Sequence, residues 1–102
     1  MALLPENDIL LRLNAAAKTA GVRLSYSNKI FFLRLLDAAE CRNGIYRTFL
    51  TVNEFSESFN MPKRTVVDSL RRLSACNAIV RRPRTKPQFT RLNKSIIELE
   101  DG

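Results

Sequence analysis

The chain has 102 residues, which is enough for one domain with a single hydrophobic core. Hydrophobic residues make up 45% of it and charged residues 26%, so the composition excludes a disordered chain and is typical of a globular protein. No apolar run reaches the length of a membrane span, and the N-terminus lacks the pattern of a signal peptide. We therefore expect a cytoplasmic protein.

Positive charge is concentrated in one part of the chain. The net charge is +7, and residues 61–94 contain ten Lys and Arg against a single acidic residue, Asp68. Residues 1–60 are almost balanced, and residues 95–102 contain three acidic residues and no basic ones. A basic segment on one side of a globular domain is typical of nucleic-acid binding. The alternative is a solvated basic face that has no partner.

The types of residue present argue against catalysis and metal binding. The chain has no His, no Gly-rich phosphate loop and no pair of carboxylates in a recognisable catalytic setting. We therefore expect no enzyme activity, no cofactor and no small-molecule ligand. Cys41 and Cys76 lie far apart in two predicted helices, and two Cys without His are too few for a zinc site. We expect both to be reduced and to serve as small apolar residues.

A first helix is predicted over residues 5–20. Glu6 and Asp8 fall in its first turn, where the helix dipole favours acidic side chains, and Gly21 can end it. Its apolar face consists of Ile9, Leu10, Leu13, Ala16, Ala17 and Ala20. The sequence leaves two uses open for this face. It can cover the core, or it can form a dimer contact, because DNA-binding modules commonly act in pairs.

A second helix is predicted over residues 28–41, with Ser25 or Ser27 as its N-cap and Asn43-Gly44 at its end. The helix is apolar around most of its circumference. Only a narrow polar strip interrupts the apolar band, made of Lys29, Arg34, Asp37 and Glu40. A band this wide predicts that other parts of the protein cover the helix on most sides. The N-terminal helix or a second subunit can supply that cover.

A short strand over residues 46–50 and a short helix are predicted next. Thr51 and Glu54 have the spacing of a capping box, in which each side chain satisfies a free backbone amide at a helix start. Apolar residues at helical spacing follow, namely Val52, Phe55 and Phe59. Asn60 tolerates a left-handed backbone, so we expect the short helix to end there.

The next helix is predicted over residues 62–75. Pro62 suits its first turn, because the missing amide hydrogen has no partner to lose there. Val66, Leu70 and Leu73 form an inward apolar stripe. At about 100° per residue, the opposite face contains Arg64, Asp68, Arg71 and Ala75, with Thr65, Val67 and Arg72 at its flanks. The pattern predicts a helix that is buried on one side and presents basic residues on the other.

A β-hairpin is predicted after this helix. Residues 78–82 and 88–92 have strand patterns, and the proline-containing segment 83–87 forms the turn between them. The hairpin contains five basic residues, Arg81, Arg82, Arg84, Lys86 and Arg91. Residues 95–102 form a short tail. Its apolar residues can pack on the core or on a partner chain.

The segment FSESFNMPKRTVVDSLRRL resembles the helix-turn-helix of bacterial winged-helix DNA-binding proteins, of the type in plasmid and phage replication proteins and small regulators. The matching positions are Phe55, Phe59, Met61, Thr65, Val66, Leu70 and Leu73. Two positions depart from the pattern: Asn60 stands where Gly is usual, and Pro62 stands where Ser or Thr usually caps the helix. The resemblance covers residues 25–94.

The resemblance implies a fold that is mainly α with a small antiparallel β-hairpin. It is a winged helix-turn-helix in the α+β class. The chain is then a single DNA-binding domain over residues 1–102, with an accessory helix at 5–20, a winged-helix core at 25–94 and a tail at 95–102. Under this interpretation the hairpin is the wing.

The resemblance further implies that double-stranded DNA is the partner. The helix over 62–75 would enter the major groove, which admits one helix, and the basic wing over 81–91 would lie on the backbone or reach into the minor groove. The candidate DNA-binding residues are Lys63, Arg64, Thr65, Val67, Asp68, Arg71, Arg72, Arg81, Arg82, Arg84, Lys86 and Arg91.

Arg64 is the candidate for a bidentate contact to guanine, and Val67 either touches a thymine methyl group or is partly buried. Two roles are open for Asp68. It can accept a hydrogen bond from cytosine, or it can hold Arg64, Arg71 or Arg72 by ion pairing along the helix. The second role is favoured because a carboxylate among three arginines has partners without DNA.

The expected function is sequence-specific DNA binding in transcription regulation, in a protein associated with the bacterial nucleoid or a plasmid. An accessory role in plasmid or phage replication, segregation or conjugative transfer is the alternative, and a winged helix that binds protein is a third. A homodimer through the N-terminal helix, helix 28–41 or the tail is expected, because one recognition helix reads only a few base pairs.

Overall fold

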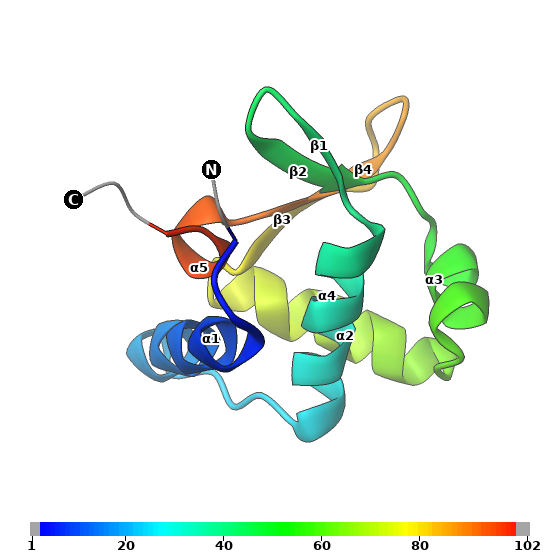
Figure 1. Ribbon diagram of the computed structural model, residues 1–102. Helices are drawn as coiled ribbons and strands as arrows, with labels where there is room; N and C mark the ends of the chain where they lie inside the picture. The colour runs from blue at the N-terminus through cyan, green and yellow to red at the C-terminus, as the bar shows by residue number, and fades with distance from the viewer. Residues whose placement is uncertain (1–2, 100–102) are drawn as a thin grey trace.

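Helices and strands alternate along the chain in the computed structural model, which describes residues 3–99 (Figure 1). Within that range there are five helices and four strands. They are α1 (Glu6–Ala20), α2 (Tyr26–Ala38), β1 (Glu40–Arg42), β2 (Ile45–Thr48), α3 (Val52–Phe59), α4 (Lys63–Ala75), β3 (Ile79–Arg82), β4 (Phe89–Leu92) and α5 (Lys94–Ile97). The fold is therefore a compact α+β domain.

The four strands form one antiparallel sheet in the order β1-β2-β4-β3. β2 is placed between its own hairpin partner β1 and the later strand β4, with Thr48 opposite Thr90. Figure 1 shows the sheet above and α2, α3 and α4 below it. One face of the sheet therefore packs on helices and the other faces solvent.

Aromatic residues from α2 and α3 form a cluster within the core. The ring of Phe31 meets the rings of Phe55 and Phe59 edge-on, at centroid distances of 5.4 and 5.6 Å. Such edge-to-face pairs are favoured beyond the area that they bury. α4 closes this cluster with its apolar stripe, and the sheet contributes Ile79 and Leu92 from its inner face.

α1 covers the core, which is the first of the two uses left open for it. Ile9, Leu13 and Ala17 are buried, and the helix contacts both α2 and α5. Leu11, on the other side of α1, is exposed. The C-terminal segment is fastened to the same helix, because Arg12 Nη1 donates to the carbonyl oxygens of Ser95 and Glu98 at 2.9 and 3.2 Å.

The short-range signals read from the sequence are confirmed at several element ends. Thr51 Oγ1 accepts from the amide of Glu54 at 3.2 Å, and Glu54 Oε1 accepts from the amide of Thr51 at 3.0 Å. Ser25, rather than Ser27, caps α2 through the same reciprocal arrangement. Asn60 ends α3 with a left-handed backbone of φ 52° and ψ 49°. Gly21 ends α1 in the same region.

The prediction of a helix over residues 28–41 was wrong at its C-terminal end. α2 stops at Ala38, and residues 40–42 form β1, which pairs with β2. Asn43 and Gly44, with φ of 53° and 74°, form a two-residue turn between the two strands. Two consecutive residues with positive φ match the twist of a hairpin, so Asn-Gly favours a hairpin turn over a helix end. The sheet therefore has two hairpins, rather than the single small one expected.

This change also corrects the expectation for Cys41. It lies on the edge strand β1 and is exposed, so it is not a core residue, whereas Cys76 is buried at the end of α4 as expected. Both thiols are free. In the tail, Ile96 and Ile97 are buried in α5 while Leu99 is exposed. The remainder of the tail, residues 100–102, lies outside the described residues.

Removal of the Thr51 cap tests how much this local signal contributes to stability. We expect Thr51→Ala to lower the free energy of unfolding by about 1 kcal/mol, because the amide of Glu54 at the start of α3 loses its side-chain acceptor. Urea unfolding followed by circular dichroism measures the difference. Ser58→Ala, an exposed change in the same helix, is the control and should leave the free energy within about 0.5 kcal/mol. Equal effects of the two changes would contradict the capping role.

Candidate nucleic-acid interface

α4 has one buried face and one exposed face, as its sequence pattern predicts. Val66, Leu70 and Leu73 are buried, mainly against α2. The opposite face presents Lys63, Arg64 and Val67 to solvent, and Val67 is 52% exposed. The partial burial considered for Val67 is therefore not found. An apolar methyl group and two cations stand together on a rigid helix, where a ligand can reach them.

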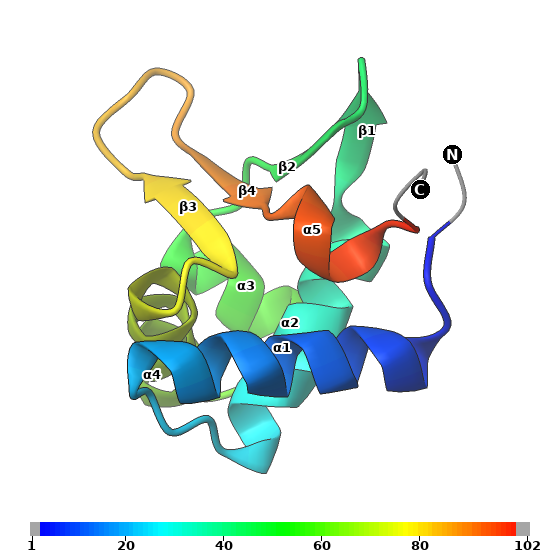
Figure 2. The same cartoon turned by 90° about the vertical axis from the view of Figure 1, so that its left-hand side faces the viewer.

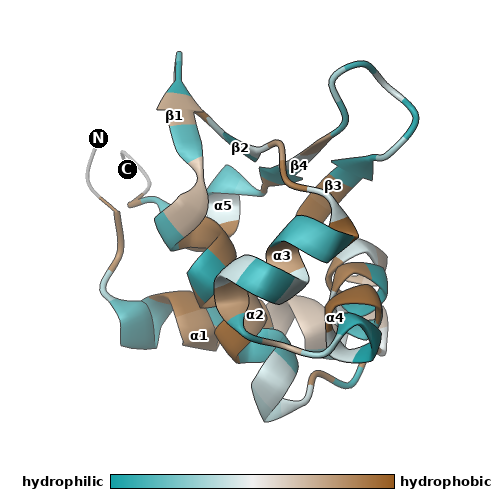
Figure 3. Ribbon diagram, turned by 90° about the vertical axis from the view of Figure 1, so that its right-hand side faces the viewer, coloured by the Kyte–Doolittle hydropathy of each residue, from teal (hydrophilic) through white to brown (hydrophobic). Residues whose placement is uncertain are grey.

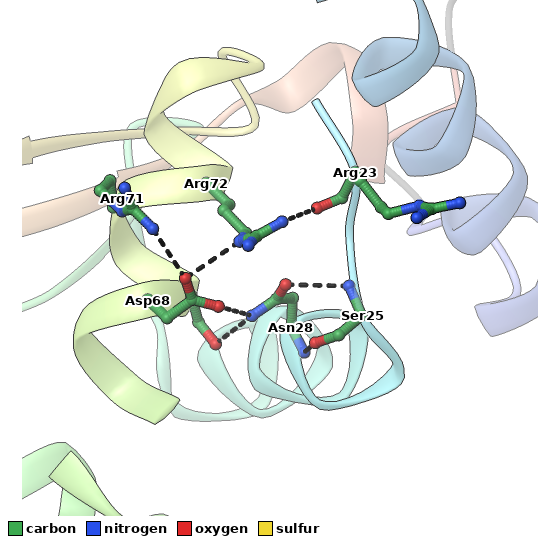
Figure 4. A network of polar contacts seen from close by, with 7 residues as sticks. Arg23, Ser25, Asn28, Asp68, Arg71 and Arg72 are labelled. Carbon is green, nitrogen blue, oxygen red and sulfur yellow. Dashed lines mark hydrogen bonds and ion pairs between the residues drawn. The ribbon is translucent and has the colours of Figure 1, made fainter. Parts of the chain in front are cut away.

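Asp68 lies at the centre of a polar network beside this face (Figure 4). Its Oδ1 atom accepts from Arg71 Nη2 and from Arg72 Nε, both at 3.0 Å. Its Oδ2 atom accepts from Asn28 Nδ2 at 3.3 Å. The ion pairing expected for Asp68 is thus present with Arg71 and Arg72. Both carboxylate oxygens have partners in the absence of DNA.

The two arginines paired with Asp68 have different surroundings. The side chain of Arg71 is 74% exposed and that of Arg72 is 36% exposed. Arg72 also donates through Nη1 to the carbonyl oxygen of Arg23, in the link between α1 and α2 (Figure 4). Arg72 therefore connects α4 to the rest of the protein, whereas Arg71 projects outward and is restrained at one end only.

Asn28 is the residue of this network that the sequence interpretation did not identify. Its side chain is fully buried. It bonds to Ser25 at the start of α2, to Asp68, and to Ser69 Oγ at 2.8 Å. Ser69 is also buried, so it is a packing residue. The sequence did contain a signal for this role. Asn28 is polar and lies three positions after the Ser25 cap, where the side chain of a capping box turns back toward the helix start.

The β3–β4 loop is the second basic element. Arg82 at the end of β3 and Arg84 and Lys86 in the loop are exposed. The hydroxyl of Thr85 lies 3.0 Å from the carbonyl oxygen of Arg82 and 2.9 Å from that of Pro87, so it ties the two sides of the tip together. Figures 2 and 3, from opposite sides, show the loop projecting on the same side of the molecule as α4. In Figure 3 the tip is coloured hydrophilic.

Arg81 and Arg91 are not grouped with the loop cations. The side chain of Arg81 is on the inner face of the sheet, where it donates to Thr90 Oγ1 at 2.9 Å and to Gln88 Oε1 at 3.2 Å. Burial lowers the pKa of its guanidinium group. Arg91 is exposed on the opposite, outer face, where it stands across from Arg47 of β2. Lys63, Arg64, Val67 and Arg71 are exposed on α4, and Thr65 is half-buried. Figures 2 and 3 show α4 on the same side of the molecule as the loop that contains Arg84 and Lys86. Arg82 precedes that loop at the end of β3.

The chemistry of this basic surface suits an anionic partner. Among the residues described, no three His, Cys, Asp or Glu side chains gather where they could hold a metal ion. In the same part of the chain, every helix is too short or too polar to cross a membrane. Comparison of the chain with protein-family models, with curated proteins and with solved structures finds no match.

The Asp68 network predicts a pH-dependent contribution to stability. Hydrogen bonds from Arg72 and then Arg71 hold the pKa of Asp68 below its ordinary value. A lowered pKa in the folded state stabilises the protein above the unfolded-state pKa of about 3.9, and this stabilisation disappears as pH falls through the folded-state value. We expect Asp68→Asn to lower the free energy of unfolding by about 0.5–1 kcal/mol near neutral pH, and by much less near pH ~2.

Urea unfolding of both proteins across this pH range measures the effect. Glu57→Gln is the matched control, because Glu57 is an exposed carboxylate on α3 that forms no ion pair with any residue in the range 3–99. The control should show no comparable difference at either pH. An Asp68→Asn difference that stays constant with pH would mean that the ion pairs contribute nothing.

Proposed function

We propose that this protein is a winged helix-turn-helix protein that binds double-stranded DNA with sequence specificity, with α4 as the recognition helix and the β3–β4 hairpin as the wing. The observation that carries the proposal is the placement of two exposed basic elements on one side of the molecule. α4 and the β3–β4 loop lie on the same side of the molecule (Figure 2), and both have exposed basic residues. α3 precedes α4 through the tight corner at Asn60, which is the order of a helix-turn-helix.

The exposed face of α4 has the side chains that base reading requires. Arg64 is exposed near the start of the helix, without an ion-pair partner in residues 3–99, so its fork of donors is available for guanine. Val67 lies nearby and offers a methyl surface to thymine. Asp68 has both oxygens engaged within the protein. It therefore acts by orienting Arg71 rather than by reading a cytosine.

The wing supplies contacts that do not depend on sequence. Arg82, Arg84 and Lys86 are exposed cations that suit contacts to phosphates rather than to base edges. Each phosphate that they neutralise releases condensed counterions. A neutral or acidic outward face on α4 would have favoured protein docking instead. The cations on both elements favour DNA. Transcription regulation is the role that we assign to this binding, and a homodimer would place two such helices on one duplex.

Selection of bound sequences from a random duplex library is the experiment that tests this function. An enriched motif supports sequence-specific recognition, and inverted or direct repeats within it reveal the subunit arrangement. Titration of the selected duplex at several salt concentrations then gives the affinity and its salt dependence. A purified protein that leaves every duplex unbound at low ionic strength would refute the proposal.

Substitutions in the two basic elements should affect binding differently. We expect Arg64→Ala to weaken binding to the selected duplex by about tenfold or more, and to random duplex much less, because it removes a base contact. Arg84→Ala or Lys86→Ala should weaken both duplexes alike and reduce the slope of log affinity against log salt by about 1. Fluorescence anisotropy with labelled duplexes measures both effects.

Arg34→Ala is the control for these variants. Arg34 is an exposed arginine on α2 and belongs to neither basic element, so its loss removes the same charge without removing a proposed contact. It should change both affinities only slightly. If Arg64→Ala weakened the selected and the random duplex equally, Arg64 would not be a base-reading residue.

A further inference from the structure

The solvent-facing side of the sheet has its own set of basic and aromatic side chains. Strand pairing places residues that alternate along each strand on the face away from the helices. We call this the outer sheet face and define it by Arg42, Arg47 and Arg91 together with Phe49 and Phe89. Arg82, at the end of β3, is counted with the wing. α4 packs against the inner face of the same sheet, so this surface is separate from the exposed face of α4.

The outer sheet face has an excess of positive charge, with Arg42, Arg47 and Arg91 against Glu40. Arg47 and Arg91 are directly opposite each other on neighbouring strands, and like charges in such a pair destabilise a sheet. Glu40 of β1 is directly opposite Arg47 on the same face and partly offsets its charge. Within residues 3–99, no acidic group forms an ion pair with these arginines. A bound polyanion would relieve this repulsion. The arrangement therefore favours an anionic partner.

The aromatic residues indicate what kind of polyanion fits. The guanidinium carbon of Arg47 is 5.4 Å from the ring centroid of Phe49 and 5.6 Å from that of Phe89. Phe49 is 37% exposed although it is a large apolar residue. Flat aromatic and guanidinium groups stack with nucleobases, but only an unpaired strand can present the faces of its bases to a protein. A duplex stacks the faces of its bases inside the helix, so it has none to offer to this surface.

A hollow at one end of the outer sheet face adds a place for a base. Its volume is about 350 Å³, and its lining includes the apolar side chains Ile45 and Val80 and the cationic groups of Arg91 and Lys94. That volume lies within the range of small-ligand pockets, roughly 300–1,000 Å³. An apolar surface with two cations beside it is complementary to a base joined to a phosphate.

We propose that the outer sheet face binds single-stranded nucleic acid. One base occupies the hollow between Ile45 and Val80, neighbouring bases stack on the group formed by Arg47, Phe49 and Phe89, and the arginines contact the phosphates. This function goes beyond duplex recognition by α4 and uses a different surface. Single-stranded DNA and single-stranded RNA both have the unpaired bases and the phosphates that this surface would bind.

The test uses the full chain and fluorescence anisotropy at low ionic strength, with labelled oligothymidylate, oligouridylate and a duplex of equal length as probes. Phe49→Leu keeps an apolar side chain and removes the flat ring, and we expect it to weaken single-strand binding about tenfold while leaving duplex binding unchanged. Arg47→Ala should weaken it at least as much, because it removes both a charge and a stacking surface. Circular dichroism verifies that both variants are folded.

Arg34→Ala is the charge-matched control, and Arg64→Ala should weaken duplex binding without weakening single-strand binding. Binding of oligothymidylate or oligouridylate that Phe49→Leu and Arg47→Ala weaken supports the proposal. The oligonucleotide that binds more tightly shows whether the preferred strand is DNA or RNA. Three results would overturn it: no single-strand binding at low ionic strength, Arg47→Ala and Phe49→Leu losses no larger than that of Arg34→Ala, or equal losses for single strand and duplex. Different variants test the two proposals: Arg64→Ala tests duplex recognition, and Phe49→Leu and Arg47→Ala test single-strand binding. Either proposal can therefore fail while the other stands.

Discussion

The packing of α4 against α2 is the contact on which the candidate DNA-reading surface depends. Val66, Leu70 and Leu73 fix which side of α4 faces inward, and their burial is not directional. The buried Asn28 side chain adds direction, because it bonds to Asp68 and Ser69 on α4. A rotation or slide of α4 would leave this amide unpaired in the interior, at a cost of about 1–3 kcal/mol. The apolar stripe therefore holds the helix, and the amide sets its angle.

Contacts within the folded protein also decide which arginines remain free for a partner. Arg72 and Arg81 are engaged within the protein, by Asp68 and the Arg23 carbonyl in one case and by Thr90 and Gln88 in the other. Arg64 is exposed, and Arg71 is held only by Asp68. A count of basic residues over 61–94 therefore overstates the charge that a ligand can reach. Folding converts part of a basic segment into structural connections.

Much of the fold could be predicted because its signals are local. Capping at Thr51, the left-handed Asn60 and the inward stripe of α4 each depend on residues within one or two turns. β1 could not be predicted in this way, because Glu40-Cys41-Arg42 has little strand propensity and becomes a strand by pairing with β2. The inward turn of Arg81, the roles of Asn28 and Arg47, and the hollow beside Lys94 all depend on contacts between distant segments. Periodicity within one element does not contain that information.

The β3–β4 hairpin connects the two proposed surfaces, because its tip projects on the same side of the molecule as α4 while its outer face forms part of the sheet surface. Its orientation is set from the inner face, where Ile79 and Leu92 are buried in the core and Arg81 is bonded to Thr90 across the two strands. A change on the inner face would move tip and outer face together. A change in the exposed side chains of the tip, such as Arg84, alters one surface without moving the other. The half-buried Arg81, hydrogen-bonded to Thr90 and Gln88, helps to hold that inner face in place. If both proposed surfaces bind, their independence requires this face to stay rigid.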